Sequence, residues 1–311
     1  MRILFSAPKK DWDDYRDLLS GALDKAGIEA EIVYALNPGD PASIDYIVYA
    51  PSSQMQDFTP FTGAKAVLNL WAGVEGLVTN TTLTQPLARM VDPGLTEGMV
   101  EYCAGHTLRH HLGTDLDVCR QDHVWDVQIP KLARDRQVTV LGLGALGSAV
   151  GTALAGLNFQ VTGWSRTLKE VEGITCLAGE AGLETALKSA EILILLLPLT
   201  KATENILNED RLALLPKGAV LINPGRGPLV DDDALVAALA SGRVSHATLD
   251  VFREEPLPEG HAFWANENIT VTPHIASATR PSSAVNVIVE NIQRGERGAS
   301  FLHLVDRSQG Y

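Results

Sequence analysis

A glycine-rich segment that follows a short apolar stretch restricts the possible folds of this chain more than any other feature. Val138–Leu141 is followed by glycines at 142, 144 and 147, in the spacing G-x-G-x-x-G, and a helical pattern then continues to Leu157. In this context Gly142 permits a tight turn, Gly144 lets the backbone approach a pyrophosphate, and Gly147 lets the helix pack closely against the strand. The N-terminus of the helix favours a bound anion. The segment therefore predicts a strand–turn–helix unit that binds a dinucleotide.

Short apolar stretches recur along the chain, and helical patterns separate most of them. The predicted strands are Ile3–Ala7, Ile28–Tyr34, Tyr46–Ala50, Ala66–Leu70, Val138–Leu141, Gln160–Trp164, Ile192–Leu197, Ala219–Ile222, Ala247–Asp250 and Ile269–Thr272. Two of the predicted helices are Asp11–Ala26 and Ala284–Gln293. Alternation of this kind is typical of parallel sheets covered by helices. We therefore predict an α/β fold with two Rossmann-like, doubly wound parallel-sheet domains: a flavodoxin-like substrate domain and an NAD(P)-binding domain.

A long helical pattern marks the predicted boundary between the two domains. Thr96 is a suitable N-cap, and apolar residues follow it at helical spacing. Residues 113–136 are polar and irregular, and we interpret them as an arm or linker. The substrate domain is predicted to span residues 1–96, completed by 280–311, and the dinucleotide-binding domain to span 97–279.

The balance of charges limits the partners of the chain. It has 25 Lys and Arg against 38 Asp and Glu, a formal net charge of −13, so most of its surface repels nucleic acids and anionic lipids. No apolar stretch approaches 18 residues, and neither the three cysteines nor the pair His106 and His110 belongs to a metal-binding motif. We expect a cytoplasmic protein with free thiols, no membrane segment, no nucleic-acid partner and no metal site.

The end of the strand after the glycine loop bears on the choice of dinucleotide. Sites for NAD usually place Asp or Glu here, where the carboxylate binds the ribose 2′-hydroxyl. This chain has Ser165, Arg166 and Thr167 instead, with no carboxylate among them. The Arg166 guanidinium can pair with a 2′-phosphate through charge-assisted hydrogen bonds. The sequence therefore predicts NADPH as the cofactor, with NADH a weaker one.

Three polar residues follow the ends of later strands, where ligands bind in open α/β sheets. Arg226 lies between Gly225 and Gly227 and can present its guanidinium to a carboxylate and a carbonyl oxygen. His274 can exchange a proton with that oxygen near neutral pH. Glu255 can bind the imidazole, orient it and favour its charged form. Because parallel strands end at one edge of a sheet, we expect these side chains to meet near the glycine loop.

Three segments of the chain resemble the signatures of the D-2-hydroxyacid dehydrogenases: 221–227, 249–258 and 272–276. Four more resemble, within that family, the branch that reduces glyoxylate and hydroxypyruvate: 64–75, 163–167, 279–281 and 305–311. The resemblance covers nearly the whole chain. Pro224 departs from the small residue that many relatives carry, and it removes one backbone donor.

The resemblance implies roles for individual residues. It implies that Arg226, Glu255 and His274 are catalytic. The cofactor residues that it implies are Leu143, Gly144, Ala145, Leu146, Gly147, Ser165, Arg166, Pro198, Leu199, Thr200, Asn223, Gly225 and Asp250. The implied substrate residues are Trp71, Ala72, Gly73 and Val74, which hold the carboxylate through backbone N–H groups, together with Arg226 and His274. It also implies a homodimer that pairs through the cofactor domain, with contacts from residues 97–136.

These observations combine into a hypothesis about the reaction. The chain is expected to reduce a small 2-oxo acid, glyoxylate or hydroxypyruvate, to glycolate or D-glycerate by hydride transfer from NADPH, with His274 as the general acid. Two alternatives stay open: an NAD-linked D-2-hydroxyacid dehydrogenase for a bulkier substrate, and a dinucleotide-sensing regulator that performs no chemistry.

Overall fold

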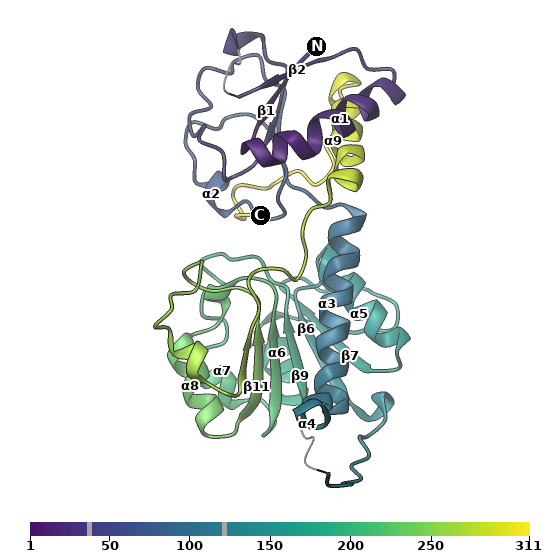
Figure 1. Cartoon of the computed structure of the whole chain (residues 1–311), viewed down its shortest axis with the longest axis vertical. Coiled ribbons are helices and arrows are strands. Elements are labelled where there is room, and N and C mark those ends of the chain that lie inside the picture. The colour runs from purple at the N-terminus through teal and green to yellow at the C-terminus, as the bar shows by residue number, and fades with distance from the viewer. Residues whose placement is uncertain (36–38, 120–122) are drawn as a thin grey trace. The chain divides into compact units, whose positions relative to one another are not determined.

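The computed structural model describes residues 1–35, 39–119 and 123–311, which form two compact units (Figure 1). The first unit combines Met1–Leu95 with Ala278–Tyr311, and the second is Thr96–Ser277. Each unit contains one sheet in which all the strand pairs are parallel. The predicted α/β class with two parallel-sheet domains is confirmed.

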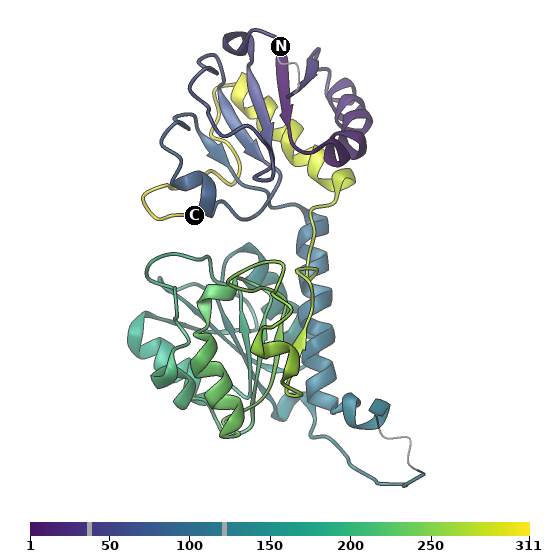
Figure 2. The same cartoon turned by 60° about the vertical axis from the view of Figure 1, so that its left-hand side comes forward.

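The sheet of the first unit has the strand order β2-β1-β3-β4-β5. Its strands are β1 (Arg2–Ser6), β2 (Glu31–Tyr34), β3 (Tyr46–Tyr49), β4 (Ala66–Asn69) and β5 (Leu87–Ala88). The helices of this unit are α1 (Lys9–Lys25), α2 (Glu75–Val78) and α9 (Pro281–Glu296), with a 3-10 turn, η1, at Pro41–Ser43. Helices α1 and α9 lie side by side although they come from opposite ends of the chain (Figure 2). Ile288 and Ile292 of α9 join Ile3 and Phe5 of β1 in one core, so the C-terminal segment completes this unit.

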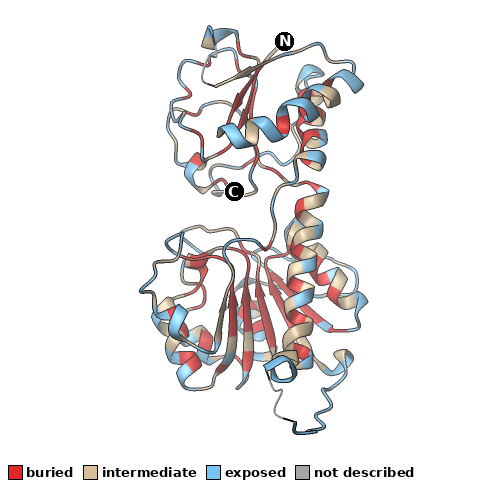
Figure 3. Ribbon diagram, viewed as in Figure 1, coloured by how far each residue is buried: buried red, intermediate tan, exposed pale blue. Residues whose placement is uncertain are grey.

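The sheet of the second unit has the strand order β12-β11-β10-β9-β6-β7-β8. Its strands are β6 (Gln137–Leu141), β7 (Gln160–Ser165), β8 (Thr175–Ala178), β9 (Ile192–Leu195), β10 (Ala219–Asn223), β11 (Val244–Leu249) and β12 (Ile269–Val271). The order reverses at β6, and the carboxyl end beside such a reversal is where open α/β sheets bind their ligands. Figure 3 shows that the strands of this sheet are largely buried, which explains why they read as apolar stretches in the sequence.

Helices cover both faces of this second sheet. They are α3 (Pro93–Leu112), α4 (Thr114–Cys119), α5 (Ala145–Gly156), α6 (Gly179–Ser189), α7 (Glu209–Ala213) and α8 (Asp232–Ala240), with 3-10 turns η2 (Ala133–Asp135), η3 (Gly227–Leu229) and η4 (Ala262–Ala265). No helix among the described residues is long and apolar enough to cross a membrane.

The predicted start of the long helix α3 was wrong. Thr96 lies inside the helix, which begins at Pro93. The Asp92 carboxylate accepts a hydrogen bond from the Gly94 N–H at 3.1 Å and so caps the first turn. Proline fits the first helical position because its φ is already helical and it has no N–H to satisfy. Asp-Pro at this place is therefore a stronger start signal than Thr96.

The segment expected to be irregular, 113–136, contains two short elements, α4 and η2. Residues 120–122 of this segment lie outside the described residues. Several of its apolar side chains face solvent, among them Trp125 and Ile129, which are 94% and 87% exposed. The edge strand β8 was not predicted, because its residues are only half-buried or exposed and form no continuous apolar stretch.

Candidate active site

The glycine loop lies at the carboxyl end of β6, and its three glycines meet different steric demands. Gly142 has φ of +108°, and a Cβ there would lie 2.5 Å from the Leu196 carbonyl oxygen. A Cβ at Gly147 would lie 1.7 Å from the carbonyl oxygen of Gly142, so only glycine lets α5 pack this close to the loop. Gly144, in contrast, is exposed and faces open space. The loop is therefore tight where the chain meets itself and open where a phosphate would approach.

The first turn of α5 supplies donors for that phosphate. Gly144 is the N-cap, and no side chain of the described residues caps the helix. The first N–H groups of a helix have no partner within it, and the helix dipole adds positive charge at this end. Ala145 is exposed, Leu146 is half-buried and Leu143 is buried beneath the loop. These features fit the pyrophosphate of a dinucleotide.

The end of β7 presents the residues expected to select the cofactor. Strand β7 pairs directly with β6, so its carboxyl end neighbours the glycine loop. Ser165 closes the strand and donates a hydrogen bond from Oγ to the Thr167 carbonyl at 2.8 Å. This turn places Arg166 on the surface, where it is exposed. No carboxylate follows the strand before Glu170.

The loop after β9 carries Pro198, Leu199 and Thr200 and is folded by a nearby hydroxyl group. Thr203 Oγ1 accepts a hydrogen bond from the Thr200 N–H at 2.8 Å and donates one to the Pro198 carbonyl at 2.7 Å. The three residues are half-buried. Because β9 lies next to β6, this loop also borders the glycine loop.

The loop after β10 presents Arg226. A Cβ at Gly225 would lie 2.7 Å from the Leu195 carbonyl oxygen, and one at Gly227 would lie 2.1 Å from the backbone of Phe252. The two glycines therefore let the backbone pass through a confined space, and Arg226 extends between them. Its Nη1 donates a hydrogen bond to the Gly225 carbonyl at 2.7 Å.

The side chain of Asn223 bonds two backbone groups of this loop and fixes its shape. Its Nδ2 donates to the Arg226 carbonyl at 2.9 Å, and its Oδ1 accepts from the Gly225 N–H at 3.2 Å. The side chain is 1% exposed. In this structure the side-chain amide is bonded to the chain and shapes the loop, and the predicted contact of Asn223 with the cofactor stays a prediction.

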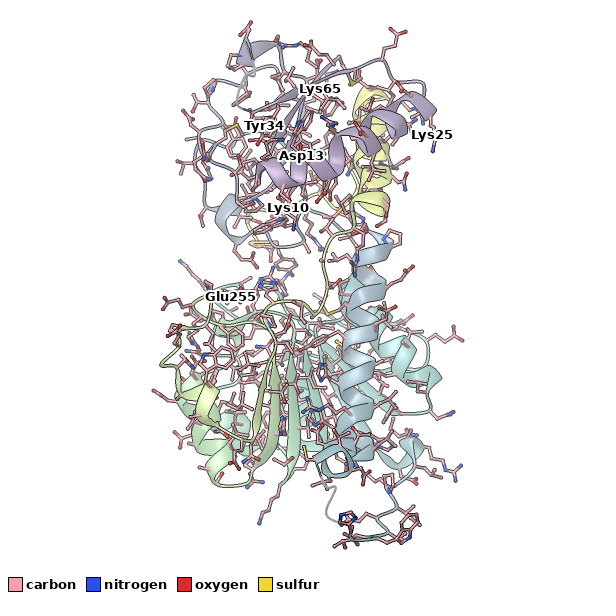
Figure 4. The ribbon with its side chains drawn as sticks, viewed as in Figure 1. Lys10, Asp13, Lys25, Tyr34, Lys65 and Glu255 are labelled. Atoms are coloured by element: carbon pink, nitrogen blue, oxygen red, sulfur yellow. The ribbon has the colours of Figure 1, made fainter. Side chains whose placement is uncertain are left out.

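Glu255 and His274 form a pair at the same edge of the sheet. His274 Nδ1 lies 2.6 Å from Glu255 Oε2, and Glu255 Oε1 accepts a hydrogen bond from the Phe252 N–H at 2.8 Å. The carboxylate is therefore held at both oxygens, and it directs the opposite nitrogen of the ring, Nε2, away from itself. The His274 side chain is 51% exposed, so this nitrogen can reach a bound molecule. Figure 4 labels Glu255 among the side chains of the second unit.

Asp250 fixes the backbone that carries His274. Its Oδ1 accepts hydrogen bonds from the Thr272 hydroxyl at 2.6 Å and the Ile275 N–H at 2.9 Å, and its Oδ2 accepts from the Ala276 N–H at 2.8 Å. The Asp250 carbonyl accepts from the N–H of His274, whose φ of +53° is in the left-handed region. Asp250 is 0% exposed, so its carboxylate is occupied by the chain. Its predicted contact with the cofactor stays a prediction, and in this structure the carboxylate holds the loop that carries His274.

The predicted substrate residues Trp71–Val74 belong to the first unit, where they follow β4 and precede α2. Trp71 is 46% exposed, whereas Val74 is buried. Asn69, the last residue of β4, donates hydrogen bonds to two carbonyls of this loop. The sequence analysis missed Asn69, although a polar residue at the end of a buried apolar strand was the available signal.

His106 and His110 of α3 are half-buried, and His110 belongs to a polar layer formed with β11 and β12. His110 Nε2 lies 2.9 Å from Thr248 Oγ1, and its ring is 5.0 Å from that of His246. Burial, with smaller contributions from His246 and Arg109, lowers the pKa of His110 to about 3. Burial also lowers the pKa values of His106 and His246. These rings are therefore held in the neutral form by their surroundings.

This layer makes stability depend on pH. Between about pH 6.5 and 3 the unfolded chain binds a proton at His110 that the folded chain does not, so stability falls as pH decreases. We expect urea unfolding to show a loss of about 2 kcal/mol from His110 between pH 7 and 5. The variant His110→Gln should flatten this slope, whereas His123→Gln, at an exposed histidine, should not. Equal slopes in both variants would contradict this origin.

The comparisons with known proteins agree with one another. Residues 106–276 match the family described as D-isomer specific 2-hydroxyacid dehydrogenase, NAD binding domain. Glyoxylate/hydroxypyruvate reductase A of Yersinia enterocolitica is 37% identical over 282 residues, which cover 88% of this chain and 90% of the relative. The protein of the same name from Serratia proteamaculans is 35% identical, with full coverage of both chains.

Two solved structures are similar over the whole chain. A D-isomer specific 2-hydroxyacid dehydrogenase from Xanthobacter autotrophicus, in complex with NADPH and MES, has a TM-score of 0.92 and 39% identity, covering 100% of this chain and 99% of its own. An NADPH-dependent glyoxylate/hydroxypyruvate reductase from Sinorhizobium meliloti, in complex with NADP and sulfate, has a TM-score of 0.88 and 30% identity, with the same coverage. This chain belongs to the D-isomer specific 2-hydroxyacid dehydrogenase family, a family of oxidoreductases that use NAD(P).

Proposed function

We propose that this chain reduces glyoxylate and hydroxypyruvate to glycolate and D-glycerate with NADPH. The observation that carries the proposal is the His274–Glu255 contact of 2.6 Å at the sheet edge where the glycine loop also lies. The names of the similar reductases from Yersinia and Sinorhizobium support the substrate and cofactor. The open space at Gly144 and the uncapped N-terminus of α5 fit a dinucleotide phosphate.

NADPH, when bound, supplies the hydride that is added to C2 of the 2-oxo acid. His274 donates its Nε2 proton to the carbonyl oxygen, which becomes the hydroxyl of the product. Glu255 stabilises the charged imidazolium before transfer and keeps its orientation. After product leaves, the half-exposed imidazole regains a proton from solvent, so each turnover consumes one hydride and one proton.

Two further groups hold the substrate in this proposal. Arg226 pairs with the substrate through its guanidinium and polarises the carbonyl bond, which stabilises the negative charge that develops on oxygen. Backbone N–H groups of Trp71–Val74 bind the carboxylate. Contacts that position a substrate for transfer supply a large part of catalysis.

A substrate panel tests the proposal. The loss of NADPH absorbance at 340 nm is followed with glyoxylate, hydroxypyruvate and bulkier 2-oxo acids, and each is repeated with NADH. Fast turnover of the two small acids with NADPH is expected. Turnover of the bulky acids alone, with NADH, would favour the dehydrogenase alternative, and cofactor binding without turnover would favour a regulator.

Arg166 is predicted to determine the choice between the two cofactors. The variant Arg166→Ala should raise the KM for NADPH by roughly 10-fold or more, because a charge-assisted contact to the 2′-phosphate is lost. The KM for NADH should change by less than about twofold, because NADH has no phosphate there. Lys169→Ala, at a basic residue three positions along the same surface segment, is the matched control. Equal effects of Arg166→Ala on both cofactors would remove the assignment.

We also propose that the protein is a cytoplasmic homodimer. The exposed apolar side chains of residues 113–136, above all Trp125 and Ile129, support contact with a second copy through this segment, because exposed apolar surface usually marks an interface. The cysteines at 103, 119 and 176 are free, which fits a reducing compartment. A single-chain mass by light scattering would contradict the dimer.

A further inference from the structure

Asn69 holds two carbonyl groups of the loop that follows β4. Its Nδ2 donates hydrogen bonds to the Trp71 carbonyl at 2.7 Å and to the Gly73 carbonyl at 2.9 Å. The Met90 N–H donates a further bond to the Trp71 carbonyl at 3.0 Å. Asn69 is 1% exposed, and its Oδ1 has no hydrogen-bond partner among the described residues. The amide therefore acts in this structure only as a donor of two hydrogen bonds, which keep both carbonyl groups pointing toward Asn69.

Turning these carbonyls inward directs two N–H groups outward. In a trans peptide the C=O and N–H bonds point in opposite directions. The N–H groups of Ala72 and Val74, which share peptide units with the two bound carbonyls, must therefore point away from Asn69. Within the described residues, neither N–H donates a hydrogen bond to the chain. Backbone donors of this kind need an outside acceptor, and N–H groups that lie close together on one turn suit an anion.

We infer that Asn69 is the positioning residue for recognition of the substrate carboxylate. It acts through the loop Trp71–Val74 and does not itself touch the substrate. The inference rests on the proposed function, because it takes the 2-oxo acid carboxylate as the anion that these N–H groups bind. It assigns selectivity for a carboxylate to a buried side chain of segment 64–75, a side chain for which the resemblance implied no role.

The variant Asn69→Asp tests this inference with almost no change in shape. A carboxylate in place of the amide has no N–H to donate and repels the two carbonyl oxygens, so the loop should lose its arrangement. We expect the KM for glyoxylate to rise roughly 10- to 100-fold, the factor equivalent to lost hydrogen bonds to a charged group. The value of kcat at saturation should change by less than about threefold, because ground-state and transition-state binding are lost together.

The control is Asn291→Asp, at another buried asparagine of the same unit. Asn291 is 2% exposed and bonds the backbone of Leu302, far along the chain from the loop. If a buried Asn→Asp change lowers stability in general, Asn291→Asp should lose stability as Asn69→Asp does. Its KM for glyoxylate should not change. Binding of NADPH, followed by its fluorescence, should be unchanged in both variants. Asn69→Ser keeps one donor on a shorter side chain, so its KM for glyoxylate should lie between the values of the wild type and of Asn69→Asp.

The outcomes separate the inference from the proposed function. If the wild type does not reduce glyoxylate, the proposed function fails, and this inference with it. If the wild type is active and folded Asn69→Asp keeps a wild-type KM, only the inference fails. Parallel loss of kcat and of NADPH binding would assign Asn69 a structural role and overturn it. If both Asn69 variants are unfolded while Asn291→Asp is folded, Asn69 has a structural role and the inference is also overturned.

Discussion

Replacement of His274 by alanine is expected to lower kcat for glyoxylate by roughly 10²-fold or more, the usual contribution of a positioned general acid. The imidazole is the group whose free nitrogen is exposed, while Glu255 holds the other nitrogen at 2.6 Å. Without it, the proton for the substrate oxygen must come from water, which is neither oriented nor charged. Steady-state kinetics at saturating NADPH measure the effect.

Two controls make the result specific. The dissociation constant for NADPH should stay near that of the wild type, because His274 acts on the substrate oxygen. His303→Ala, at a histidine of the other unit, should leave kcat unchanged. Glu255→Gln keeps a hydrogen-bond acceptor and removes the charge, so it separates orientation of the ring from stabilisation of its charged form. Near-normal turnover in His274→Ala would refute the role.

Replacement of Arg226 by alanine is expected to lower kcat/KM by roughly 10²- to 10³-fold, with KM and kcat both affected. The guanidinium is proposed to bind the ground-state substrate and to stabilise the charge that develops on its oxygen, so both parameters should change. The flanking backbone should keep its path, because Gly225, Gly227 and the Asn223 bonds define it. Initial rates over a range of glyoxylate concentrations give the two parameters.

Arg226→Lys is the matched variant. Lysine keeps the positive charge but not the planar pair of donors, so it should recover only part of the loss. Full recovery would show that charge alone matters. Wild-type kinetics in Arg226→Ala would remove Arg226 from the catalytic site.

Most of the strands could be predicted because strands buried on both faces read as continuous apolar stretches. The observed bounds of β3, β6 and β9 differ from the predicted ones by one or two residues at their ends. Strand β8 was missed because an edge strand is only partly buried. The predicted start of α3 was wrong because Thr96 and Asp92 are both good N-caps. Only Pro93, which suits the first helical position, shows that Asp92 is the cap.

The site could be predicted only as far as residue types and strand ends allow. The predicted contact between Glu255 and His274 is present in the structure, because each residue follows the end of a parallel strand. It did not reveal that Asn223 and Asp250 are fully buried and bonded to their own loops, since burial of a polar group depends on distant packing. The polar Asn69 at the end of an apolar strand was a signal in the sequence, but its two partners are backbone carbonyls, which the sequence cannot reveal.

The most direct test of the central claim is a crystal structure of this chain with NADPH and oxamate, an unreactive analogue of a 2-oxo acid. The account predicts oxamate against the nicotinamide ring, with its carbonyl oxygen within hydrogen-bond distance of His274 Nε2 and the Arg226 guanidinium. Oxamate bound away from these two side chains, or a nicotinamide ring remote from them, would contradict it.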